Sequence, residues 1–67
     1  MKPRPATVIT DRDRDEAEVL RTLPRSEQRL VVQTIYKQAK CRYLTAEERR
    51  EELRRAKALQ KLLRIRF

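Results

Sequence analysis

The chain has 67 residues, a single cysteine (Cys41) and no histidine. A disulfide within the chain needs two cysteines, and a structural zinc site needs several cysteine or histidine ligands, so neither can stabilise it. A chain of this length hides a small share of its surface, and its own apolar core is marginal. Association of two copies is the remaining way to bury more apolar surface. The sequence therefore predicts a homodimer.

The composition favours helices. Glycine is absent, which removes Gly-rich phosphate loops and the usual hairpin turns, and 42% of the residues are charged. Glu, Arg, Leu, Ala, Gln and Lys dominate the second half, and all of them favour helix. We expect an all-α fold, in which a short leading helix precedes a helical hairpin.

Prolines and capping residues divide the chain. Pro3 and Pro5 disfavour helix near the N-terminus, and Pro24 ends a first helix that Thr10 or Asp11 can cap. The segment Thr-Ala-Glu-Glu, 45–48, is a capping box that starts the last helix. The predicted boundaries are 1–9 for a flexible basic arm, 10–67 for a single helical domain, and 11–22, 24–43 and 46–66 for its three helices.

Apolar residues recur at helical spacing on the second and third predicted helices, so we expect these helices to pack together. The second helix also has a weaker apolar seam on its opposite side, including Leu30 and Thr34, where a second copy could pack. Leu62 and Ile65 lie off the main stripe and are expected to touch a partner. The predicted core and dimer residues are Leu30, Val32, Ile35, Ala39, Leu53, Leu59 and Leu63.

A row of cations follows the last predicted helix at spacings of three or four residues, and no acid interrupts it. At 1.5 Å per residue, the row extends roughly 21 Å. It is either a solvated helix face or a contact ridge for phosphate or carboxylate groups, which arginine recognises well. The residues of this basic ridge are Arg50, Arg54, Lys57, Lys61 and Arg64.

Two tyrosines, Tyr36 and Tyr43, are seven residues apart and share a face of the second predicted helix. Their rings either pack in the core with the hydroxyls at its edge, or anchor a partner, because tyrosine is enriched at binding hot spots. Arg29 and Lys40 border this face. We expect Tyr36 to be the main partner contact, with Tyr43, Arg29 and Lys40 around it.

The net charge of +8 attracts nucleic acid, anionic lipid or acidic protein surfaces. The segment TLPRSEQRLVVQTIY is similar to the opening helix of sigma-factor or LuxR-type DNA-binding domains. The helix that follows is rich in Glu and Arg and lacks the small polar residues of a recognition helix. Specific reading of bases by that last helix is therefore not expected, while non-specific binding stays open.

The layout of residues 11–67 resembles very small phage-encoded regulators. It shares with them an acidic-capped leading helix, a helix with a mid-length tyrosine and a basic last helix. The resemblance implies helical hairpins that dimerise and bind host proteins, as the anti-activator of a quorum-sensing transcription factor does, and it implies that Tyr36 contacts the partner. The strong positive charge departs from that pattern.

No nucleophile–base pair or metal-ligand cluster is visible, so we expect a non-catalytic protein without cofactor or metal. No apolar run approaches the ~20 residues that span a bilayer, and the N-terminus lacks the apolar core of a signal peptide. A cytoplasmic location with reduced Cys41 is therefore expected. The favoured function is binding and inhibition of a host protein, and the alternative is nucleic-acid binding through the basic ridge.

Overall fold

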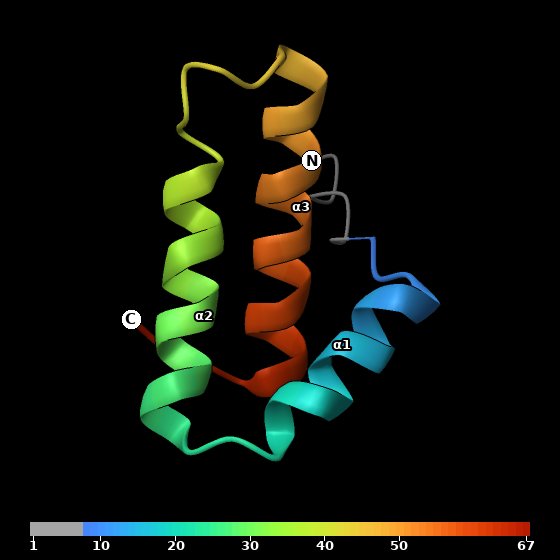
Figure 1. The fold of residues 1–67 in the computed structure, drawn as a ribbon. Coiled ribbons are helices and arrows are strands. Elements are labelled where there is room, and N and C mark those ends of the chain that lie inside the picture. The colour runs from blue at the N-terminus through green and yellow to red at the C-terminus, as the bar shows by residue number, and fades with distance from the viewer. Residues whose placement is uncertain (1–7) are drawn as a thin grey trace, which may run out of the picture.

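A computed structural model describes residues 8–67, so residues 1–7 of the expected arm lie outside the described part. Within it the chain forms three helices and no strand, which confirms the all-α prediction: α1 (Asp11–Arg21), α2 (Arg25–Gln38) and α3 (Ala46–Leu63). Figure 1 shows α2 and α3 side by side as an antiparallel hairpin, with α1 against the second half of α3. No helix of this part is both long and apolar enough to cross a membrane.

Capping boxes start two of the helices. The Thr45 hydroxyl accepts from the Glu48 backbone N–H at 3.1 Å, and the Glu48 carboxylate accepts from the Thr45 N–H at 3.4 Å, as the sequence predicts. Thr10 and Asp13 make the same reciprocal pair at the start of α1, with distances of 3.2 and 3.0 Å. Each box satisfies backbone donors that the first turn of a helix leaves without a partner.

Helix α2 is shorter than predicted. It begins at Arg25, with Pro24 as its N-cap, and it ends at Gln38 rather than at residue 43. Residues 39–44 form the reversal into α3, in which the Cys41 N–H donates to the Gln38 carbonyl and the Cys41 carbonyl accepts from Leu44. No glycine or proline marks this end, so composition and spacing do not reveal it. Tyr43 therefore lies in a loop, and the helix face it was expected to share with Tyr36 does not exist.

Helix α3 ends at Leu63, three residues earlier than predicted, because Arg64 adopts a left-handed conformation with φ 52° and ψ 46°. The chain then turns back, and the Ile65 N–H donates to the Gln60 carbonyl. The tail formed by residues 64–67 runs across the hairpin behind α2 in Figure 1. Ile65 is buried in the core at 4% exposure, so it is not free to touch a partner as expected. Leu62 is half-buried and packs against the same core.

The core is shared by all three helices and the tail. Val32, Ile35, Leu59 and Leu63 are buried as predicted, and Ala39 is half-buried. Ala56 is buried as the apolar stripe of the last predicted helix requires, and Ala17 and Leu20 are buried on the thin apolar face of α1. Ala58 and Ile65 are buried although the sequence did not predict it.

Two predicted core residues lie at the surface instead. Leu30 is 61% exposed because it is on the side of α2 that faces away from α3. Leu53 is 38% exposed. At about 100° per residue it lies about 120° around α3 from Leu59, and so outside the stripe to which it was assigned. One chain thus buries a core of its own. Of the apolar seam expected on the outer side of α2, Leu30 is the large apolar side chain that remains exposed there.

Candidate interaction surfaces

The predicted basic ridge is broken at Arg54. Its guanidinium lies 2.7 Å from the Asp13 carboxylate of α1 and 2.7 Å from the Glu51 carboxylate of α3. It also donates to the Val8 carbonyl at 2.8 Å. The expectation that no acid interrupts the ridge is therefore wrong, because sequence spacing cannot show an acid that arrives from another helix. Arg54 joins α1 to α3 instead of facing a partner.

A second ion pair joins the same two helices. The Arg55 guanidinium of α3 pairs with the Glu16 carboxylate of α1, and another of its nitrogens lies 3.6 Å from Glu52. The pair with Glu16 adds a charged contact beside that of Asp13 and Arg54. Neighbouring arginines of α3 are thus used to hold α1.

The Asp13 carboxylate is the buried member of this network, with a side chain 2% exposed. Burial by itself would raise the pKa of Asp13, but hydrogen bonds from Arg54 and Thr10 outweigh it, and the pKa lies below its ordinary value. A group with a lowered pKa in the folded state stabilises that state while it is ionised. The contribution is complete above the unfolded pKa of about 4 and is lost as the pH falls through the folded value.

Replacement of Asp13 by asparagine keeps the shape of the side chain and removes its charge. We expect Asp13→Asn to lower the free energy of unfolding at pH 7 by about 1–3 kcal/mol, because hydrogen bonds to a charged group are lost. Urea unfolding followed by circular dichroism would measure this. At pH 2 the difference from the wild type should shrink, because protonation removes the same charge there.

The control for this change is Asp15→Asn, at an exposed position of the same helix, where we expect a change within about 0.5 kcal/mol. An equal loss for Asp13→Asn at both pH values would contradict the assigned role of the charge.

Tyr36 is occupied inside the molecule. It is half-buried, its hydroxyl donates to the Gln60 side chain of α3, and its ring meets that of Phe67 edge-on with centroids 6.1 Å apart. Burial raises the pKa of Tyr36. Tyr43 is 90% exposed in the loop at the far end of α2. The structure therefore does not join the two tyrosines into one partner-binding face, although Arg29 and Lys40 are exposed as that prediction required.

A different set of cations converges where α2 begins and α3 ends. Three shallow hollows adjoin there and share residues of the tail and of the first turns of α2. Among the described residues, no carboxylate lines any of the three. We call this the basic surface, and its cations are Arg25, Arg29, Lys57, Lys61, Arg64 and Arg66.

Sequence reasoning found part of this surface. Lys57, Lys61 and Arg64 belonged to the predicted ridge, whereas Arg50 lies toward the other end of α3. Arg25 and Arg66 were missed. They join the surface because the tail turns back at Arg64, and the Arg25 guanidinium holds it by donating to the carbonyls of Leu63 and Arg64. A glycine at residue 64 would have indicated the left-handed turn that brings the tail to α2. The sequence has arginine there, so the turn could not be predicted.

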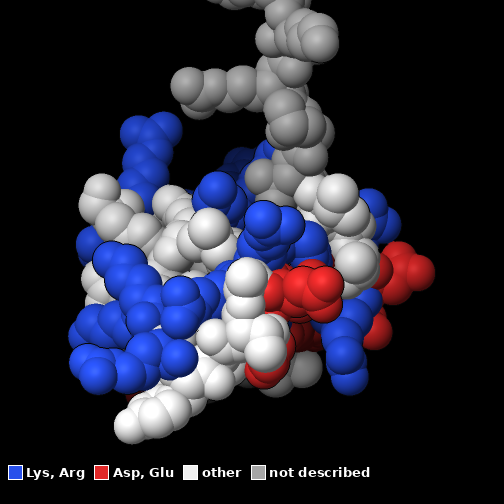
Figure 2. Space-filling model, turned by 90° about the horizontal axis from the view of Figure 1, so that it is seen from above, with Lys and Arg blue, Asp and Glu red and all other residues white. Residues whose placement is uncertain are grey.

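The acidic residues are segregated from this surface. Five of the ten lie on α1, four in the first two turns of α3, and one, Glu27, on α2. Figure 2 views the opposite end of the molecule, with the α2–α3 loop, where Lys and Arg cover one side and the acidic side chains gather on the other side among further cations. Asp13, Glu16 and Glu51 are further tied to arginines of α3. Nine of the ten acidic residues therefore lie on α1 and α3, and none lines the hollows of the basic surface.

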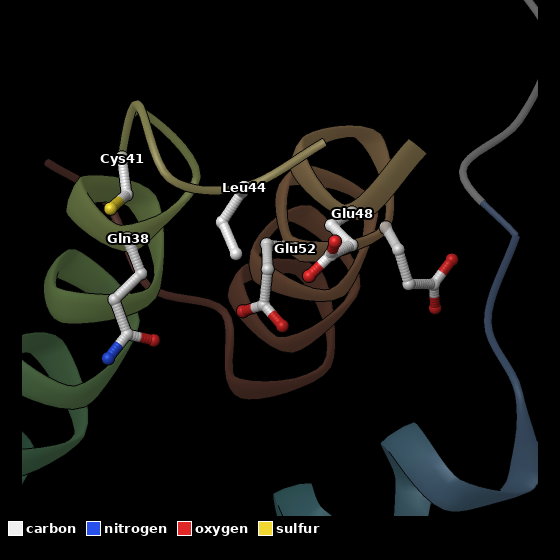
Figure 3. A pocket seen from close by; sticks show the side chains of 6 residues that line it. Gln38, Cys41, Leu44, Glu48 and Glu52 are labelled. Carbon is white, nitrogen blue, oxygen red and sulfur yellow. The ribbon is translucent and has the colours of Figure 1, made fainter. Parts of the chain in front are cut away.

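A separate hollow of about 400 Å³ lies at the other end of the hairpin. In Figure 3 Leu44 and Glu52 point into the space between α2 and α3. One carboxylate oxygen of Glu52 is buried without a hydrogen bond and lies 3.6 Å from the Arg55 guanidinium. We call this the tip hollow, and it is lined by Gln38, Cys41, Leu44, Glu48, Glu51 and Glu52. Although four of these residues are Cys or Glu, residues 8–67 contain no group of three or more such side chains placed so that they could hold a metal ion.

Comparison with known proteins finds no matching family model, no matching curated protein and no matching solved structure. Function must therefore be inferred from these two surfaces.

Proposed function

We propose that the protein is a small, non-catalytic nucleic-acid-binding protein that contacts phosphates through the basic surface. One observation supports this proposal. Six cations from α2, α3 and the tail line three adjoining hollows, and no carboxylate of the described residues lines any of them. The Arg25 guanidinium already donates to the carbonyls of Leu63 and Arg64 and adds positive charge only. Arg29, Arg64 and Arg66 are exposed arginines, and a planar guanidinium matches phosphate oxygens with two parallel hydrogen bonds. Contacts of this kind release condensed counterions and supply affinity that does not depend on sequence.

The arrangement of aromatic residues favours phosphate contacts over stacking with bases. Proteins that bind single strands stack successive bases on exposed aromatic rings. Here Tyr36 and Phe67 pack against each other, and Tyr43 is at the opposite end of the hairpin from the basic surface. A double-stranded backbone is therefore the better match.

The hypothesis of a host-protein inhibitor is weakened at its main expected anchor, Tyr36, while Arg29, Lys40 and Tyr43 stay exposed. Tyr36 is hydrogen-bonded to Gln60, and Ile65 and Leu62 pack in the core. Each of these three side chains already has contacts inside the fold with which a partner would have to compete. For this reason we place nucleic-acid binding first.

Removal of two cations from the basic surface should weaken binding in a salt-dependent way. We expect Lys57→Ala with Lys61→Ala to lower the affinity for a duplex at low salt. The slope of log affinity against log salt should decrease in magnitude by about 2, which is about one unit for each phosphate that the variant no longer neutralises. Fluorescence anisotropy with a labelled 20-base-pair duplex at several salt concentrations would measure the affinity and its slope with salt.

Arg50→Ala is the matched control, because it removes one exposed cation of the same helix outside the basic surface. We expect little change for it. If it weakens binding as much as either lysine variant alone, only net charge matters and the assigned surface is wrong.

Protein binding is kept as a second candidate function because of the tip hollow. Tyr43 is 90% exposed and precedes Leu44, which lines the tip hollow, and tyrosine is enriched in interface cores. We expect affinity capture from nuclease-treated host lysate to retain a protein with the wild-type chain and to lose it with Tyr43→Ser. Val19→Ser, at an exposed apolar position on α1, should keep it. Equal recovery with both variants would remove this candidate.

Self-association is a further proposal, and Leu30 is its support. This side chain is 61% exposed on the outer side of α2, and a second copy packing there would bury it. We then expect sedimentation velocity at increasing concentration to show a dimer that Leu30→Lys dissociates. A wild-type chain that sediments as a monomer throughout would contradict the homodimer.

A further inference from the structure

The outer face of α2 is made of side chains that nothing else in the described structure uses. It is exposed along its length, while the inner face buries Gln28, Val32 and Ile35. Residues 8–67 contain no hydrogen-bond partner for the polar side chains of this face. The residues of this outer face are Ser26, Arg29, Leu30, Gln33 and Lys37.

The chemistry of this face matches the edges of base pairs. Arginine bonds in a bidentate manner to the guanine O6 and N7 atoms, and glutamine does the same with the adenine N6 and N7 atoms. Serine can contact either base, and an apolar side chain such as Leu30 can contact the thymine methyl group. No carboxylate belongs to the outer face. Glu27 is the single acid of α2. It lies on the flank of the helix, about 100° from Ser26 of the outer face and about 100° from Gln28 of the inner face.

The position of α2 leaves this face accessible. Figure 1 shows α2 along one edge of the molecule, with α1 on the far side of α3. The 14 residues of α2 extend about 21 Å at 1.5 Å per residue. The major groove of B-form DNA, about 12 Å wide and 8.5 Å deep, admits a helix of this kind.

Cations lie beside the outer face where phosphates would flank such a helix. Arg64 and Arg66 of the tail line one hollow together with Arg25 and Arg29, and Ser26 and Arg29 continue into the next hollow with Leu30 and Gln33. The outer face is thus continuous with the basic surface. One docking could therefore bring the tail to the backbone and α2 to the bases.

We propose that α2 is a recognition helix that enters the major groove of duplex DNA, where Arg29 and Gln33 contact base edges while Arg64 and Arg66 contact phosphates. This inference rests on the proposed function and specifies its ligand. Duplex RNA does not fit, because its major groove is too narrow and deep for side chains to read. A second copy packed on Leu30 would cover the same face, so a chain cannot dimerise through Leu30 and bind DNA through α2 at the same time.

The first experiment tests the groove. A random-sequence duplex bound to the full chain is titrated with methyl green, which occupies the major groove, or with distamycin, which occupies the minor groove. Methyl green should displace the protein and distamycin should not. Displacement by distamycin alone, or equal binding of a duplex RNA of the same length, overturns the inference.

The second experiment tests base reading. Duplexes with a randomised centre are selected for binding to the wild-type chain, to Gln33→Ala, to Arg29→Ala and to Lys57→Ala. The wild type should enrich a short motif. Gln33→Ala and Arg29→Ala should each reduce the preference at one position by about 5- to 150-fold, the range expected for one bidentate pair. Lys57→Ala, outside α2, should lower affinity and keep the motif.

The outcomes separate this inference from the proposed function. Salt-dependent binding without any enriched motif overturns the recognition helix and leaves phosphate binding standing. No binding to any nucleic acid overturns both. A dimer that dissociates with Leu30→Lys, and that persists when sedimented with the duplex, also overturns the inference, because the outer face is then occupied. Circular dichroism melting of each variant shows that the fold is kept.

Discussion

The contact between Asp13 and Arg54 fixes the leading helix α1 to α3 of the hairpin. Asp13 caps α1 through Thr10, and its carboxylate reaches Arg54 in the middle of α3. A buried charge is costly without a partner, so the positions of α1 and α3 are coupled. Ala17 and Leu20 of α1 pack into the core. The same pair removes one cation from the surface, and this decides which of the remaining cations can meet a ligand.

The local features of the sequence predicted the elements well. The capping box at 45–48 fixes the start of α3, and helical periodicity identifies the buried positions of Val32, Ile35, Leu59 and Leu63, because both signals depend on neighbours in the chain. The helix ends at Gln38 and Leu63 were missed for a physical reason. Helices often end at glycine, and this chain has none, so ordinary residues form these ends without a compositional sign.

The candidate site was harder to predict, because it depends on contacts between distant residues. Arg54 looked free by its spacing in α3, yet its partner Asp13 lies 41 residues earlier. Tyr36 looked equally suited to a core or to an interface. What decided between these roles was the tail, which brings Phe67 onto its ring, together with Gln60 of α3, which accepts from its hydroxyl. The proposed nucleic-acid surface depends on the same tail, which carries Arg64 and Arg66 back to α2.

The left-handed backbone at Arg64 has a consequence for how such a chain can change. For a residue with a Cβ atom this conformation costs roughly 1–2 kcal/mol, and glycine would adopt it without that penalty. Glycine, however, would remove one of the six cations of the basic surface. At residue 64, glycine would therefore favour the stability of the fold, whereas arginine favours the positive charge of the basic surface. The chain has arginine there.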